Sequence, residues 1–295
     1  MKNRYKFAIL IFALIFLVFL PHNSLLNNIE DVLKEKTVLS KNFEDDAEEQ
    51  KAAAQAKLKA AQERKTKQDG LLAEVNQTLV VNTEFAVSII DINNSENFGI
   101  SETASFHSAS VTKVLVATAA LQGVESGKYK LTQTLGNSTF KYQLQQMINQ
   151  SNNNSWDLFN NLLGFNGEQK VADQLGLTGV NMNQTHMTTN AVSQLLLKLY
   201  KGEALQTENR DLLFSFMQNT ETENRITPSI PTGVSFYHKT GTFNGGVHDA
   251  AIVIHPKNPF ILVIFTNDNK GTPWETRFSS FQKAAILVYG YFDSI

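Results

Sequence analysis

Three short strings along the chain carry side chains that together can perform acyl transfer. Ser110 stands three residues before Lys113, which places an amine near a nucleophilic hydroxyl. The Ser-Asn-Asn string at 151–153 adds a second hydroxyl and an amide, and the Lys-Thr-Gly-Thr string at 239–242 adds a cation with two hydroxyls beside it. A short string alone matches by chance, so context must decide which serine is the nucleophile.

The context of Ser110 favours a chemical role. Residues 111–121 are apolar on nearly every side, which predicts a buried helix with Ser110 in its first turn. Lys113 is one turn further on, on the same helix face. Because burial of an unpaired ammonium is costly and lowers a lysine pKa, we expect Lys113 to act as a base toward the Ser110 hydroxyl. The alternative, a simple helix cap at Ser110, leaves the trapped lysine unexplained.

Two other serines also stand three residues before a lysine. Ser138 and Lys141 lie in a polar stretch, where Ser138 is expected to cap the next helix. Ser280 and Lys283 lie in the last predicted helix, where the lysine can reach solvent. Neither lysine sits in an apolar run, so Ser110 remains the preferred nucleophile.

The other two strings also have both a structural and a chemical interpretation. The polar string at 151–153 lies between two predicted helices and can be a turn or a cap. Its chemical use would be a hydroxyl that passes a proton to a leaving nitrogen and an amide that binds a substrate backbone. The string at 239–242 can be an exposed turn, but Gly241 would let a ligand approach the strand, and Lys239 would bind a carboxylate.

The elements that must position these residues fall into a simple order. The sequence predicts strands at residues 84–91, near 98, and at 234–242, 247–255 and 260–266. Helices are predicted at 71–81, over most of 110–216, and at 274–292. Strands at both ends with helices between them predict an α/β (α+β) fold. We expect an antiparallel five-stranded sheet flanked by helices, with an inserted all-helical lobe and a cleft at their junction.

The N-terminus is typical of an export signal. Lys2, Arg4 and Lys6 precede a charge-free run at residues 7–20. The run is shorter than the roughly 20 residues that usually span a bilayer, yet no small-residue cleavage site follows it. We therefore expect residues 1–26 to be an uncleaved membrane anchor, with a removed signal peptide as the alternative. The protein would be extracytoplasmic, tethered to the membrane or secreted if cleaved.

Composition separates the rest of the chain into two parts and excludes several classes of function. Residues 27–70 are polar and predict a helical stalk or linker, and residues 71–295 have the composition of a globular domain. The formal net charge of -2 gives no support for nucleic-acid binding. The absence of cysteine excludes disulfides, thiolate metal sites and a cysteine nucleophile. We expect no metal and no cofactor.

The three strings, in this order and roughly 40 and then 90 residues apart, resemble those of the penicillin-recognising serine hydrolases. The resemblance is greatest to the class A β-lactamase-like group, whose landmarks also appear at 147–153, 175–177, 188–189 and 238–242. It covers residues 71–295 and implies a β-lactamase/transpeptidase-like fold. It also implies Ser110 as nucleophile, Lys113 as the activating amine and Ser151 as proton relay.

The resemblance also implies a substrate-binding set and an oxyanion hole. The residues that would bind substrate are Asn153, Lys239, Thr240, Gly241 and Thr242. The oxyanion hole would consist of the backbone N–H groups of Ser110 and Thr242.

Two departures from the family pattern stand out. Asn152 occupies a position where the family commonly has aspartate, a mostly structural difference. The larger departure concerns the loop that carries, in the family, the glutamate that activates water for deacylation. The corresponding residues here, 178–187, form too short a segment and contain no carboxylate. Glu168 precedes the helix before this segment and does not match. His186 is the only titratable group nearby, and a lone histidine is more often structural.

The sequence thus predicts an exported serine hydrolase that forms an acyl-Ser110 intermediate on peptidoglycan stem peptides or on β-lactam amides. One alternative is a working β-lactamase with an atypical deacylation route. A second is a sensor or binding module that stays acylated. A third is a scaffold that keeps the motifs without turnover.

Overall fold

The computed structural model describes residues 22–295. The charged and apolar residues that predict the anchor lie outside this range, so that prediction stays a prediction. Over residues 22–295, no helix combines the length and the apolar character needed to cross a membrane. The chain forms two compact units, residues 1–65 and residues 66–295.

A single long helix, α2 (His22–Leu79), takes the place of the predicted stalk and of a separate helix at 71–81. Its sequence is rich in alanine, glutamate, lysine and glutamine, which are good helix formers. Gly70 does not interrupt it, since glycine in a helix costs only about 1 kcal/mol relative to alanine. Leu71 and Val75, near the end of the helix, are buried against the sheet, whereas most described side chains before Lys65 are exposed.

The centre of the second unit is one five-stranded antiparallel sheet in the order β2-β1-β10-β9-β8. Its strands are β1 (Glu84–Asp91), β2 (Glu96–Ile100), β8 (Phe236–Phe243), β9 (Gly246–Val253) and β10 (Phe260–Asn267). The first strand, β1, pairs with the last, β10. The predicted sheet is confirmed, including the return of the first strands to the last.

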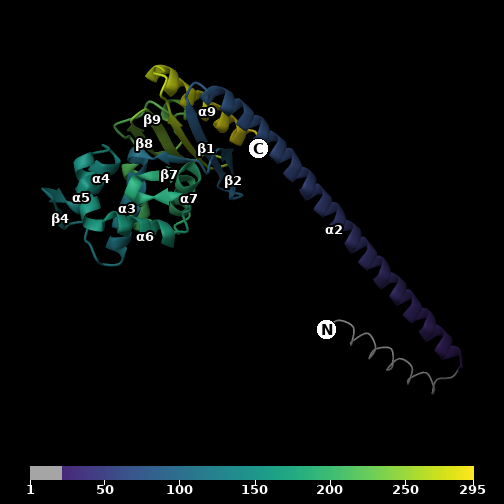
Figure 1. The fold of residues 1–295 in the computed structure, drawn as a ribbon. Helices are drawn as coiled ribbons and strands as arrows, with labels where there is room; N and C mark the ends of the chain where they lie inside the picture. Colours follow the sequence, from purple (N-terminus) through teal and green to yellow (C-terminus); the bar gives the residue numbers. More distant parts are fainter. Residues whose placement is uncertain (1–21) are drawn as a thin grey trace. The chain divides into compact units, whose positions relative to one another are not determined.

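Strand alternation gives the sheet two apolar faces. In β1, Ala86 and Ile90 belong to the core under the helical lobe, whereas Val87 and Ile89 belong to the core on the other face. Helix α7 (Thr189–Tyr200) packs on β1 and β10 from the lobe side. The opposite face is covered by the last turns of α2 and by α9 (Trp274–Asp293), as Figure 1 shows.

The inserted lobe, predicted to be all-helical, is mostly helical but is accompanied by short strands (Figure 1). It contains α3 (Lys113–Glu125), α4 (Phe140–Ile148), α5 (Asn153–Leu163), α6 (Phe165–Gln174) and α8 (Thr207–Phe216). Two small sheets accompany these helices. One joins β3 (Ser105–His107), β7 (His186–Thr188) and β6 (Val180–Asn181), and the other joins β4 (Thr134–Leu135) and β5 (Ser138–Thr139).

Candidate active site

Ser110 lies in a 3-10 turn, η2 (Ala109–Thr112), that leads directly into α3. The α-helix therefore begins three residues later than predicted. Ala109 has φ of 50°, a left-handed conformation that is uncommon for a residue with a side chain and that turns the chain into η2. The residue at the cap of η2 is Ser108 and that at the cap of α3 is Thr112, so Ser110 caps neither element.

Lys113 is buried, with 1% of its surface exposed, and its amine is held by the second string. Lys113 Nζ donates to Ser151 O at 2.6 Å and to Asn153 Oδ1 at 2.7 Å. A neutral amine has two N–H donors, which these two acceptors satisfy, so its lone pair remains for a proton from Ser110. Ser110 Oγ itself makes no hydrogen bond within residues 22–295, and catalytic hydrogen bonds often form only once substrate is bound.

The hydroxyl of Ser151 lies between two amines. Lys239 Nζ is 2.8 Å from Ser151 Oγ, and Lys113 Nζ is 3.5 Å from the same oxygen. Ser151 has a φ of 51°, a left-handed backbone conformation that residues other than glycine rarely adopt. Because the oxygen accepts from Lys239, its own proton is available to a leaving group.

Burial lowers the pKa of both lysines. It lowers the pKa of Lys113 to about 8, and only the attraction of Asp157 opposes this change. Burial, with repulsion from Lys113 and Arg225, lowers the pKa of Lys239 to about 7. A carboxylate bound beside Lys239 would restore its charge and leave Lys113 as the neutral amine.

The two asparagines of the second string have different surroundings. Asn152 is the N-cap of α5, where its side-chain oxygen accepts from Ser155 N at 2.9 Å. Asn153 is exposed, and its oxygen is engaged by Lys113. The NH₂ group of Asn153 can therefore donate to a substrate carbonyl.

The third string lies on β8, the edge strand that faces η2. A Cβ at position 241 would be 3.0 Å from Ser108 O and 3.1 Å from Ser110 N, so glycine is what lets the strand backbone approach the nucleophile. Thr242 is exposed beside Ser110, while Thr240 is mostly buried.

Arg225 is a site residue that sequence reasoning missed. It is buried, and its Nη2 donates to Thr242 Oγ1 at 2.5 Å while Nη1 donates to Gly241 O at 2.8 Å and to His248 O. Burial lowers the pKa of Arg225 to about 10, so the guanidinium stays charged at neutral pH. It adds a second cation near Lys239 and Thr242. The surrounding sequence contains no motif that would have indicated this, because Arg225 reaches the site only through tertiary packing.

Behind β8, an ionic cluster holds the strand and the loop that carries Arg225. His238 Nδ1 is 3.0 Å from Asp249 Oδ1, and His238 Nε2 is 3.2 Å from Glu223 Oε2. Burial alone would lower the pKa of His238, but the two carboxylates outweigh it and raise that pKa to about 9. His238 is thus a buried cation that ties β8 to β9 and to the loop.

A pocket of about 210 Å³ opens over Ser110. Among the predicted residues, Lys113, Asn153 and Thr242 also line it. Its further walls, which the sequence did not indicate, are His107, Ala109, Trp156, Thr185 and Phe243. The rings of His107 and Phe243 stack at 4.2 Å, and Lys113 Nζ lies 5.8 Å from the centre of the Trp156 ring. Aromatic rings therefore surround the amine and the hydroxyl.

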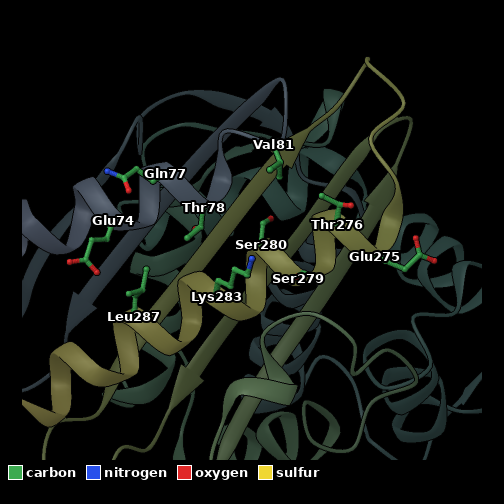
Figure 2. A pocket seen from close by; sticks show the side chains of 10 residues that line it. All are labelled: Glu74, Gln77, Thr78, Val81, Glu275, Thr276, Ser279, Ser280, Lys283 and Leu287. Atoms are coloured by element: carbon green, nitrogen blue, oxygen red, sulfur yellow. The ribbon is translucent and has the colours of Figure 1, made fainter.

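The two other serine–lysine pairs, Ser138 with Lys141 and Ser280 with Lys283, lie in other environments. Lys141 is exposed, and the cap of α4 is Thr139, not Ser138 as predicted. Ser280 donates to Arg277 O at 2.6 Å, and Lys283 is exposed. Figure 2 shows this last pair along α9, in a groove of about 820 Å³ that the end of α2 also lines, on the sheet face opposite the lobe.

The segment expected to support deacylation is short in the structure as well. Residues 178–187 form β6, the 3-10 turn η3 (Met182–Gln184) and the start of β7. Glu168 does not precede the helix, as predicted, but lies buried in the first turn of α6. Burial raises the pKa of Glu168 to about 7, and neither carboxylate oxygen has a partner over residues 22–295. His186 Nδ1 is bound to Gln184 O at 2.7 Å, and its ring does not line the Ser110 pocket.

No group of three or more acidic or histidine side chains within residues 22–295 is arranged to hold a metal ion. The chemistry that the site offers is that of hydroxyls, amines and amides.

The family model and the curated relatives that match this chain are all β-lactamases. The model of the Beta-lactamase enzyme family matches residues 72–292. Beta-lactamase VEB-1 from Pseudomonas aeruginosa is 23% identical over 252 residues, which cover 69% of this chain and 84% of that protein. Beta-lactamase 3 from Bacillus cereus is 32% identical over 99 residues, which are 32% of this chain and 31% of the relative. The chain thus spans about a third of the length of one relative and most of the other.

Solved structures share the fold. A variant of the last common ancestor of Gram-negative class A β-lactamases superposes with a TM-score of 0.72 at 20% identity, over 76% of this chain and 99% of that one. A β-lactamase from Xanthomonas campestris gives 0.72 at 21% identity, over 76% and 98%. One from Chitinophaga pinensis gives 0.69 at 22% identity, over 75% and 98%.

Proposed function

The chain belongs to the Beta-lactamase enzyme family, and from that premise we propose that it is an exported serine acyl-hydrolase that forms an ester on Ser110. The observation that carries the proposal is that Lys113 lines one pocket with Ser110 and shares the Ser151 hydroxyl with Lys239. Both of these amines are buried. A purely structural role would not require burial of two amines so close together.

In the proposed acylation step, neutral Lys113 takes the proton of Ser110 Oγ, and the oxygen attacks the substrate carbonyl carbon. Backbone N–H groups of Ser110 and Thr242 stabilise the oxyanion. Ser151 Oγ then donates its proton to the leaving nitrogen, the C–N bond breaks, and the proton on Lys113 replaces the one that Ser151 has lost. All atoms and protons are conserved in this step.

The proposed substrates are amides that carry a nearby carboxylate, namely peptidoglycan stem peptides and β-lactams. Lys239 and Arg225 supply the positive charge, and Thr242 supplies a hydroxyl. The NH₂ of Asn153 would bind the carbonyl of the substrate backbone. We also propose that residues 1–26 tether the protein to the membrane outside the cytoplasm, on the basis of Lys2, Arg4, Lys6 and the apolar run that follows.

A sensor that remains acylated is the second candidate. It is favoured by residues 178–187, which contain no carboxylate to activate water. In that case slow hydrolysis of the ester would keep the ligand bound as a signal.

The test is a time course of the full chain with a fluorescent penicillin, a chromogenic cephalosporin and a stem-peptide mimic. We expect covalent labelling that Ser110→Ala abolishes, together with release of D-alanine from the mimic. Rapid cephalosporin turnover would instead identify a working β-lactamase. Stable labelling without D-alanine release would identify the sensor. A parent chain that is never labelled would refute the proposal.

A further inference from the structure

The short segment at 178–187 leaves the second half-reaction without the carboxylate that the family places there, so another group must activate water if the ester on Ser110 is hydrolysed. Few carboxylates approach the two amines. Asp157 attracts Lys113, while Asp249 and Glu221 attract Lys239.

Of these three, Asp157 makes no hydrogen bond among the described residues and belongs to the helix whose Asn153 and Trp156 line the pocket, although Asp157 itself does not line it. Asp249 is buried and bound to His238 and to the backbone of Ile226. Glu221 lies on the loop near Lys239, and Lys239 does not line the Ser110 pocket. Asp157 is exposed and makes no hydrogen bond within residues 22–295.

Helix α5 places Asp157 on the face that borders the pocket. Asn153, whose oxygen accepts from Lys113, precedes Asp157 by four residues, one helical turn. Trp156, the residue before it, lines the pocket and lies 5.8 Å from Lys113 Nζ. The same face therefore contacts the amine and presents the carboxylate.

Two further atoms on this face indicate a place for water. Trp156 Nε1 and, one turn later, Asn160 Oδ1 are buried and have no hydrogen-bond partner among the described residues. Buried polar atoms of this kind are normally satisfied by ordered water. Asp157 is three residues before Asn160 and is its neighbour on the helix surface, whereas Trp156 points to an adjacent side of the helix.

We propose that Asp157 is the general base that activates water for hydrolysis of the acyl-Ser110 ester, with Trp156 Nε1–H helping to hold that water. This inference rests on the proposed acyl-transfer function. Asp157 takes one proton from water, and the resulting hydroxide oxygen bonds to the ester carbonyl carbon. The bond between that carbon and Ser110 Oγ then breaks, and the proton that Asp157 took from water passes by way of neutral Lys113 to Oγ. Asp157 is then a carboxylate again, Lys113 is neutral and Ser110 is a hydroxyl, as before acylation.

The experiment measures acylation and deacylation separately in the full chain. The protein is labelled with a fluorescent penicillin in a stopped-flow instrument, excess label is removed, and loss of the bound label is followed by gel. In Asp157→Asn we expect deacylation to slow at least 100-fold, the range for loss of a general base. Acylation should remain within about threefold of the parent. Trp156→Phe, which keeps the ring and removes one donor, should slow deacylation about tenfold.

Glu221→Gln is the matched control, since it removes one exposed carboxylate near the other amine. Its deacylation should equal that of the parent, and its thermal unfolding and that of Asp157→Asn should both match the parent because each side chain is exposed.

Several outcomes would overturn the inference. One is an acyl-enzyme whose lifetime is the same in the parent and in Asp157→Asn, which would leave the acylation proposal intact. Another is an equal loss of acylation and deacylation, which would mean that Asp157 acts only through the charge of Lys113. Absence of any label on the parent would refute the proposed function itself, and this inference with it.

Discussion

The proposed role of Lys113 makes a quantitative prediction about how acylation depends on pH. Burial lowers the pKa of Lys113 from 10.5 to about 8. At pH 7 the neutral fraction of such an amine is about 10%, roughly 300 times that of a lysine with its ordinary pKa. Because the neutral form is the base, acylation should rise about tenfold per pH unit between pH 6 and 7.5 and level off above pH 8.

The measurement is the stopped-flow acylation rate from pH 6 to 9.5, with an ester or amide substrate that has no carboxylate. Such a substrate removes any contribution from carboxylate binding at Lys239. Lys113→Ala should lose at least 100-fold in rate at pH 8, whereas Lys239→Ala should keep both the rate, within about tenfold, and the rise with pH.

The result is decisive because Lys239 also has a lowered pKa, about 7. If the rise with pH survives in Lys113→Ala and disappears in Lys239→Ala, the base is Lys239, acting through the Ser151 hydroxyl. Equal losses in the two variants, or a rate that does not change between pH 6 and 9, would also refute the assignment of Lys113.

Three further predictions test the parts that position the site. Gly241→Ala adds a Cβ within 3.0–3.1 Å of the backbone around the nucleophile, so acylation measured by label should fall at least tenfold; a variant with parental rates would refute the close approach. Arg225→Lys loses the contact to Thr242 Oγ1. In steady-state kinetics its KM should rise about tenfold for substrates that carry a carboxylate and stay unchanged for substrates that lack one. His238→Gln should alter the pH dependence of stability, measured by urea unfolding. The raised pKa of His238, about 9, stabilises the fold below pH 6.5, and this contribution, up to about 3 kcal/mol, is lost as pH rises through 9. The lowered pKa of Glu223, about 2, stabilises the fold above pH 4.5 and is lost as pH falls through 2. The variant should therefore show a flatter profile between pH 6.5 and 9, and an unchanged one would contradict the cluster's role.

The sheet was predictable because its strands carry their own signals. Residues 84–91 were predicted to be a strand and are one, and the runs that became β9 and β10 differ from prediction by at most two residues at each end. Apolar runs of this length, bounded by Asn, Gly and Pro, leave few alternatives. The helix over 22–79 was harder, because Gly70 suggested a boundary that an exposed helix tolerates.

The candidate site was predictable where chemistry and local context coincide, and not elsewhere. The lysine at 113 stood out because the residues around it are apolar, and the structure buries it as expected. Arg225 has no such signal, since it reaches the site through packing of a loop distant in sequence. His107 and Asp157 are close in sequence to Ser110 and Asn153, but no motif includes them. The position of Glu168 was wrong because Gly164, with φ of 71°, separates two helices that the sequence does not clearly divide.

Because Lys113 and Lys239 share the Ser151 hydroxyl, a substrate that binds at Lys239 changes the charge state of Lys113. Lys113 and Lys239 both lie within 3.5 Å of Ser151 Oγ, and two ammonium groups this close repel in a buried site. Burial and repulsion from Lys113 both lower the pKa of Lys239, so the site disfavours two positive charges. A substrate carboxylate at Lys239 moves the charge to Lys239 and leaves Lys113 neutral. A substrate with a carboxylate would thus create the base that attacks it, so selectivity for such substrates should appear in the acylation rate as well as in affinity.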